Sequence, residues 1–140
     1  MAFVILIGRI LLGLIFVGGG VGHLMDTDGT AAYAESRGVP SSRLMAQLSG
    51  VLILAAGAGI ILGIWPDLAA LGAAVYVLIA AFMVHHFWTD EDPTMQQAEM
   101  SMFMKNLSIA GGMLLLFALM SIWGEEIGMT ITGPLFDLSL

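Results

Sequence analysis

The sequence contains no cysteine, and only 11% of its residues are charged. Without cysteine, the chain itself cannot form disulfides or use a thiolate as nucleophile or metal ligand. Four lysine and arginine residues stand against eleven acidic residues, giving a formal net charge of −7. This balance excludes a basic nucleic-acid surface and a polybasic contact with anionic lipid headgroups. Soluble domains usually carry about 25% charged residues, so this chain requires an apolar solvent.

Four long apolar runs make up most of the chain, and all eleven acidic residues lie outside them. A helix needs about 20 apolar residues to cross a hydrocarbon core of about 30 Å. The runs cover approximately residues 2–24, 44–64, 68–87 and 102–123. The first is too long for a signal peptide and lacks a basic leader, so we expect a retained first helix. The sequence predicts one domain over residues 1–140, an all-α integral membrane four-helix bundle.

The connections between the runs predict how the bundle is threaded. Only Trp65–Asp67 separates the second run from the third, so these two spans must be antiparallel neighbours. The first connection, residues 25–43, is long enough for a short interfacial helix. Asp28 suits its N-cap, Gly38 suits its C-terminal cap, and Pro40 stops it.

This threading divides the polar residues between two membrane faces, side A with both termini and side B. Side A receives Trp65, Asp67, Trp123, Glu125, Glu126 and a tail, residues 124–140, that is too short to span and is expected at the interface. Side B receives His23, Arg37, Arg43, His85, His86, Trp88, the acidic turn 90–93 and Lys105. All three tryptophans fall at predicted span ends, where amphipathic rings are favoured. The basic residues weakly favour side B as cytoplasmic.

Glycine is abundant, with 18 residues, and it forms small surfaces on three of the spans. The surfaces are Gly18–Gly20 with Gly22, the pair Gly59 and Gly63, and Gly111–Gly112. Helices in lipid attract one another through close backbone approach at small residues. We expect tight packing within one bundle, with a homo-oligomer face as the alternative.

Several short motifs follow one another in a fixed order along the chain. They are Gly8-Arg9 with Gly13, Phe16 and the glycine cluster, Gly38 and Pro40, Leu48 to Gly50 with Gly57 and Gly63, His85-His86-Phe87-Trp88, Lys105-Asn106 with Gly111-Gly112, and the terminal Gly133-Pro134 with Asp137. Their order and spacing resemble the DoxX family. The resemblance implies a four-helix bundle in a prokaryotic plasma membrane. Some members or relatives of that family are linked to quinone-coupled thiosulfate oxidation or to membrane redox assemblies.

The chain departs from the family pattern at four positions. His23 stands in place of a lysine, Ile53 in place of a mid-membrane glutamate, Asp67 in place of a basic residue, and His86 in place of a proline. An intramembrane carboxylate is costly to hold and is therefore a functional candidate. Because Ile53 replaces it here, a mechanism that uses that glutamate as proton carrier or ligand cannot be transferred to this chain.

The remaining candidate ligand-binding residues gather on side B. They are His23, His85, His86, Trp88, Lys105 and Asn106. Adjacent helical residues point about 100° apart, so at most one of the two neighbouring histidines faces the bundle axis. One interpretation is a quinone headgroup site, with histidine and asparagine bonding the carbonyls and the tryptophan beside the ring.

Two other interpretations of side B stay open. A metal ion could bind His23, His85 and an acid such as Glu99, because neutral imidazole is a common metal ligand. No HExxH or CxxC spacing supports a metal, and a bis-histidine haem is disfavoured because all three histidines sit at one membrane edge. The third interpretation treats the histidines as interfacial residues satisfied by water and loop carbonyls.

Arg9 is a charge about a third of the way into the first span, where it needs a partner or a route to water. We expect its side chain to snorkel toward side A and reach water, Asp67, Glu125 or Glu126. The alternative is an anion-binding role inside the bundle, with Tyr76 at comparable depth as a hydrogen-bond partner.

The sequence holds no complete catalytic set, and it favours a non-enzymatic role. We expect a membrane subunit or scaffold in contact with lipid, working with a redox partner protein in the quinone-linked assembly that the resemblance implies. The rival is a small-molecule or lipid binder or transporter that uses the bundle interior without redox chemistry. A cavity reaching Arg9 or Tyr76 from side A would favour the rival, and a lateral cleft near His85 and Trp88 would favour the quinone role.

Overall fold

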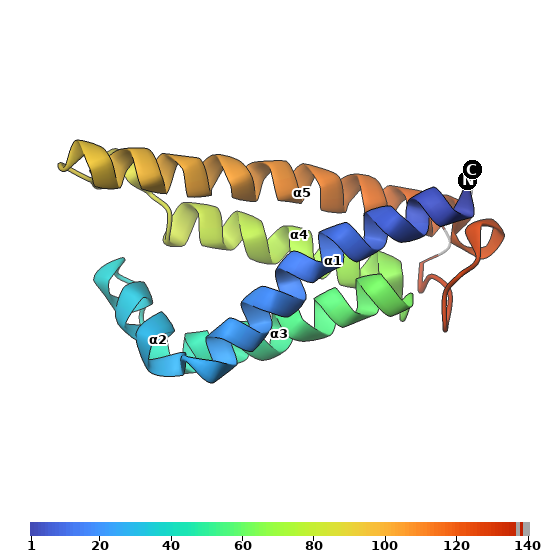
Figure 1. The fold of residues 1–140 in the computed structure, drawn as a ribbon, viewed down its shortest axis with the longest axis horizontal. Helices are drawn as coiled ribbons and strands as arrows, with labels where there is room; N and C mark the ends of the chain where they lie inside the picture. Colours follow the sequence, from blue (N-terminus) through green and yellow to red (C-terminus); the bar gives the residue numbers. More distant parts are fainter. Residues whose placement is uncertain (137, 139–140) are drawn as a thin grey trace.

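The computed structural model describes residues 1–136 and 138, and five α-helices make up most of that part. They are α1 (Ala2–Met25), α2 (Thr27–Ser36), α3 (Ser42–Leu62), α4 (Pro66–Met83) and α5 (Pro93–Ile127), with the 3-10 turn η1 (Phe87–Thr89) between the last two (Figure 1). Four of the helices are long and apolar enough to span a membrane. The predicted all-α bundle with a short helix between its first two spans is confirmed.

The bundle is built from two helix pairs. α1 packs along α3, α4 packs along α5, and α3 joins the pairs through α4. α1 crosses close to α5 near side A, and the two axes diverge toward side B, where α2 follows (Figure 1). The apolar core runs between the pairs, with Ile60, Met113 and Met120 fully buried.

Glycine brings α1 against α3 at Gly20, which belongs to a predicted surface, and at Gly57, which does not. A Cβ placed on Gly20 would lie 2.8 Å from the Gly50 carbonyl oxygen, and one on Gly57 would lie 2.8 Å from the Val17 nitrogen. Gly18 and Gly22 differ, because no atom comes within 4 Å of a Cβ placed there. A homo-oligomer face through such open glycines stays a prediction.

Two helix boundaries differ from the predicted spans. α4 ends at Met83, before the histidine pair, so the assumption that His85 and His86 continue the third span as a helix is wrong. The Arg37 Nε donates to the Val84 carbonyl at 2.7 Å and so satisfies a group that a longer helix would have used. α5 begins at Pro93, well before residue 102, because Asp92 caps it by accepting from the Met95 N–H at 3.0 Å.

Arg9 contradicts the expectation that it snorkels to water or to an acid. Its side chain is only 1% exposed, and its guanidinium donates to the Ile60, Ile61 and Met129 carbonyls at 2.8, 3.0 and 2.9 Å. The last carbonyls of a helix lack intrahelical partners, and a guanidinium offers five donors. Arg9 therefore caps the C-terminus of α3 from inside the bundle.

The segment after α5, residues 128–136, folds back across the side-A end and is held there by polar contacts. The Thr132 hydroxyl accepts from the Trp65 N–H at 2.9 Å, and Gly133 forms an isolated parallel bridge with Ile64. Asp67 is fully buried and accepts the Leu135 and Phe136 N–H groups at 2.9 and 2.6 Å. We call this segment the tail strap. Asp137, which belongs to the terminal motif with Gly133-Pro134, lies outside the described residues.

Candidate functional site

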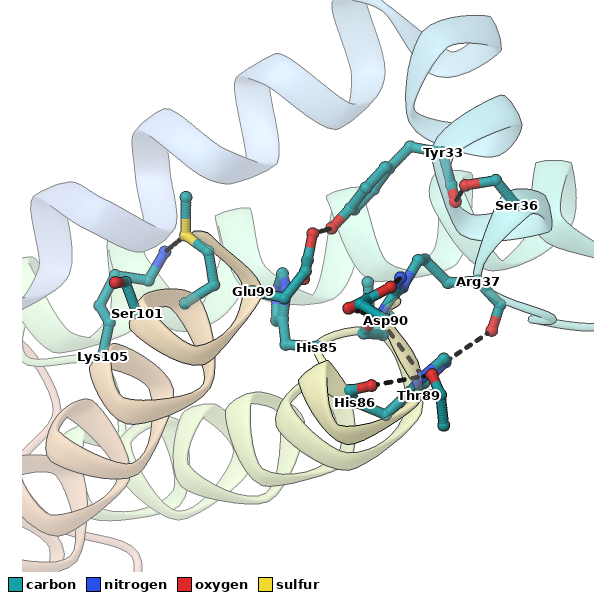
Figure 2. A network of polar contacts seen from close by, with 12 residues as sticks. Tyr33, Ser36, Arg37, His85, His86, Thr89, Asp90, Glu99, Ser101 and Lys105 are labelled. Atoms are coloured by element: carbon teal, nitrogen blue, oxygen red, sulfur yellow. Dashed lines mark hydrogen bonds and ion pairs between the residues drawn. The ribbon is translucent and has the colours of Figure 1, made fainter. Parts of the chain in front are cut away.

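Three parts of the chain converge on side B: α2, the turn between α4 and η1, and the first turns of α5 (Figure 2). α2 begins just after α1 because the Asp26 side chain accepts from the Gly29 N–H at 3.0 Å and caps it. The early start of α5 places residues 93–101 as helix beside this turn. Polar side chains from all three parts meet where they converge.

Glu99 lies at the centre of the network and is only 5% exposed. Its Oε1 accepts the Tyr33 hydroxyl at 2.6 Å, and its Oε2 lies 2.7 Å from His85 Nδ1 (Figure 2). Hydrogen bonds to an ionised carboxylate are short and strong, and both distances fit that class. The carboxylate therefore links α2, α5 and the turn after α4. We call Tyr33, His85 and Glu99 the side-B triad.

The same contacts indicate which groups of the triad donate hydrogen bonds. Partial desolvation and the neighbouring Glu99 carboxylate raise the pKa of Tyr33, so its hydroxyl keeps its proton and donates it. With the tyrosine donating to one carboxylate oxygen, the geometry assigns His85 Nδ1–H as donor to the other. In the neutral imidazole, Nε2 then carries a lone pair. Nε2 makes no hydrogen bond within the described chain.

A second group of contacts fastens α2 to the end of α4. Arg37 binds Asp90 with both terminal nitrogens, at 2.7 and 3.1 Å. That hydrogen bond lowers the pKa of Asp90 and raises the pKa of Arg37. The His86 ring lies 3.1 Å from the Arg37 carbonyl through Nε2 and 2.7 Å from the Thr89 hydroxyl through Nδ1. Figure 2 shows these contacts beside the triad.

The structure separates the residues that the sequence grouped on side B. His85 faces Glu99 on α5, and His86 faces Arg37 on α2, so the two histidines point into different surroundings. His23 is hydrogen-bonded to Ser49 of α3 at 2.9 Å rather than to the triad.

The other three predicted residues also stand apart from the triad. Lys105 is exposed, with Nζ 3.2 Å from the Met102 sulfur. Asn106 is 6% exposed and lies about 10 Å along α5 from Glu99, as seven helical residues require. Trp88 belongs to an aromatic cluster of its own. As a result, His85 is the single member of the predicted set that bonds directly to the triad carboxylate.

The aromatic cluster consists of Phe82, Phe87, Trp88 and Phe103. Trp88 packs against the other three with ring centroids 5.3–6.5 Å apart, mostly edge to face. Phe82 is 57% and Trp88 53% exposed, which leaves an exposed apolar surface at this end of the bundle. Phe103 is one helical turn beyond Glu99, so this surface and the triad occupy the same end of α5.

Sequence reasoning missed Tyr33, Arg37 and Asp90 as site residues and considered Glu99 only as a metal ligand. A usable signal was present in Asp92-Pro93, which is a helix start and would have placed Glu99 on α5. The partners on α2 depend on how α2 lies over the bundle. That placement is a tertiary property with no local pattern.

No group of three His, Asp or Glu side chains that could hold a metal ion occurs among the described residues. Two hollows of about 300 and 330 Å³ lie at the side-A end, one between α5 and the tail strap and one between α5 and the start of α1. Neither is lined by Arg9 or Tyr76. Neither is lined by His85 or Trp88, so these two hollows match neither the cavity that would have favoured the rival nor the cleft that would have favoured the quinone role.

Fold and site define a multi-pass membrane protein with four spanning helices and a polar network at one membrane edge. A family model for DoxX matches residues 4–86, and the chain belongs to the DoxX family.

Two curated relatives support this assignment. The chain is 35% identical to the inner membrane protein YqjF of Escherichia coli (strain K12) over 112 residues, 80% of each chain. It is 38% identical to the inner membrane protein YphA of the same organism over 112 residues, 80% of this chain and 79% of the relative. No solved structure matches. The predicted family and the predicted location in a prokaryotic plasma membrane are both confirmed.

Proposed function

We propose that this protein is a membrane subunit that holds a quinone-type headgroup at the side-B triad and presents it to a redox partner protein. The observation that carries the proposal is the buried Glu99 carboxylate, which accepts from Tyr33 and His85 at once. Holding a carboxylate at the membrane edge is costly. A carboxylate that orients an imidazole through Nδ1 is a recurrent way to make the opposite nitrogen a usable base or acceptor.

The surroundings of the triad suit a ligand that arrives from the bilayer. The aromatic cluster is exposed at the same end of α5 and can pack against a planar ring and its apolar tail. The triad side chains supply hydrogen bonds and a proton acceptor, whereas electron transfer would fall to the partner protein. This division fits a subunit better than a self-sufficient enzyme.

The test is retention of the quinone-type ligand, in its oxidised or reduced form, by protein purified in mild detergent, compared between wild type and single variants. We expect His85→Ala to retain less of this ligand, by roughly two- to tenfold for a neutral hydrogen bond between the ligand and the imidazole. His86→Ala is the matched control, because the adjacent ring contacts Arg37 and Thr89 instead of Glu99. His23→Ala should also retain quinone, since His23 bonds Ser49.

Equal retention in all four proteins, with unchanged folding, would contradict the proposal and leave the histidines as interfacial residues. Co-purification of a phospholipid or another small molecule, lost in His85→Ala while no quinone is found, would instead support the rival role of a binder without redox chemistry. Mass spectrometry of bound lipids and proteins separates these outcomes and identifies any redox partner.

A further inference from the structure

We infer that the side-B triad selects the hydroxyl-bearing, reduced form of its ligand, a hydroquinone or related phenol, over the oxidised quinone. This inference rests on the proposed function and deepens it, because it states which chemical form the site prefers. The inference follows from which hydrogen-bond donors and acceptors of the triad remain free after Tyr33, His85 and Glu99 have bonded to one another.

The Glu99 carboxylate accepts hydrogen bonds from both Tyr33 and His85, so these donors are not free to bind a ligand. The Tyr33 hydroxyl has one proton, and it is directed at Oε1 at 2.6 Å. In the neutral imidazole, the single N–H of His85 is directed at Oε2 at 2.7 Å. What the triad offers a ligand is therefore an acceptor, the Nε2 lone pair of His85.

A quinone carbonyl oxygen can only accept a hydrogen bond, so the Nε2 lone pair has nothing to give it. A phenolic O–H can donate to that lone pair and make the bond that the imidazole lacks. Two other donors, Arg37 and Asn106, are poorly placed to reverse this preference. Arg37 is committed to Asp90 and the Val84 carbonyl, and Asn106 lies about 10 Å farther along α5.

His85 is also accessible to a ligand while remaining fixed in orientation. Its side chain is 15% exposed, against 6% for that of Glu99. Its ring lies 6.4 Å from the Tyr33 ring, centroid to centroid, at a tilted angle. The ring thus has neighbours on both α2 and α5, and these contacts fix which nitrogen faces the carboxylate.

The experiment measures binding of three ligands with the same short tail to the full-length protein in lipid nanodiscs. The ligands are a benzoquinone, its hydroquinone kept reduced without oxygen, and a resorcinol analogue, whose 1,3-dihydroxy ring cannot be oxidised to a quinone. Equilibrium dialysis is run at about pH 8, where an ordinary imidazole is neutral. We expect the hydroquinone and the resorcinol to bind roughly two- to tenfold more tightly than the quinone.

Two variants show whether the preference comes from the imidazole tautomer. In Glu99→Gln, the amide NH₂ can donate to Nδ1, which moves the imidazole proton to Nε2 and should abolish or reverse the preference. Tyr33→Phe is the control, because it removes a hydroxyl at the carboxylate but leaves the Glu99–His85 contact. It should keep the preference for the hydroxyl-bearing ligands.

Each outcome separates this inference from the proposed function. Equal binding of the quinone and the hydroquinone, or tighter binding of the quinone, would overturn the inference, while loss of that binding in His85→Ala would still support the proposed site. Absence of His85-dependent binding for all three ligands would overturn both. If Glu99→Gln does not fold, the comparison of the three ligands on the wild-type protein still decides the inference.

Discussion

For Arg9, the structure shows a role that differs clearly from the one predicted from the sequence. Arg9→Leu would leave the Ile60, Ile61 and Met129 carbonyls without their guanidinium donor. Hydrogen bonds from a charged group contribute more than neutral ones, so we expect a loss of about 2–4 kcal/mol in the free energy of unfolding. The side chain that the sequence analysis expected, which snorkels to water or to an acid, would not leave these carbonyls unpaired on removal.

Thermal unfolding in detergent checks this prediction, with Arg9→Lys as the companion variant. Lysine keeps the charge but lacks the planar donors that reach three carbonyls, so it should recover only part of the stability. Unchanged unfolding in Arg9→Leu would mean that water or backbone rearrangement satisfies the end of α3.

Asp90 predicts a pH dependence for the contact between α2 and the end of α4. The Arg37 hydrogen bond lowers the pKa of Asp90 below its ordinary value of 3.8. Because the folded-state pKa is the lower one, this contact stabilises the fold above the unfolded-state pKa and is lost as the pH falls through the folded-state pKa. The stability difference between wild type and Asp90→Asn should be constant near neutral pH and shrink toward pH 3. A difference that is independent of pH would rule out this ion pair as its source.

At the level of helices, the contact between α1 and α3 depends on which glycines face inward. A Cβ on Gly20 would lie 2.8 Å from the Gly50 oxygen, whereas Gly18 has open space. We expect Gly20→Ala to cost about 1–3 kcal/mol through overpacking. Gly18→Ala is the matched control and should be neutral or slightly stabilising, since alanine favours the helix. Equal effects on thermal unfolding would contradict the close approach of α1 to α3.

The sequence predicted the helices better than their ends, and their ends better than their polar contacts. Hydropathy alone locates four spans, because the acidic residues fall outside them. It misplaces the ends of α4 and α5, where an Arg37 side chain and the Asp92 cap decide the boundary. The Tyr33–Glu99 contact joins residues 66 positions apart, and such pairs leave no periodic pattern in one sequence.

At the scale of the molecule, two buried charges of opposite sign hold the tail strap, and no ion pair joins them within the described residues. Arg9 binds the strap through the Met129 carbonyl, and Asp67 binds it through the Leu135 and Phe136 N–H groups. The Arg9 guanidinium donates to backbone carbonyl oxygens, and the Asp67 carboxylate accepts from backbone N–H groups. At side A these buried charges are therefore satisfied by peptide groups, whereas at side B the polar side chains meet one another.

The position of the chain ends has a practical consequence for assigning compartments. Met1 and the tail strap lie at the same end of the bundle (Figure 1), so a topology reporter fused at either terminus should give the same signal. A reporter inserted at Gly38, which has φ +79° in the exposed turn after α2, should give the opposite one. Together, the two fusions would identify the compartment that the side-B end of the bundle faces.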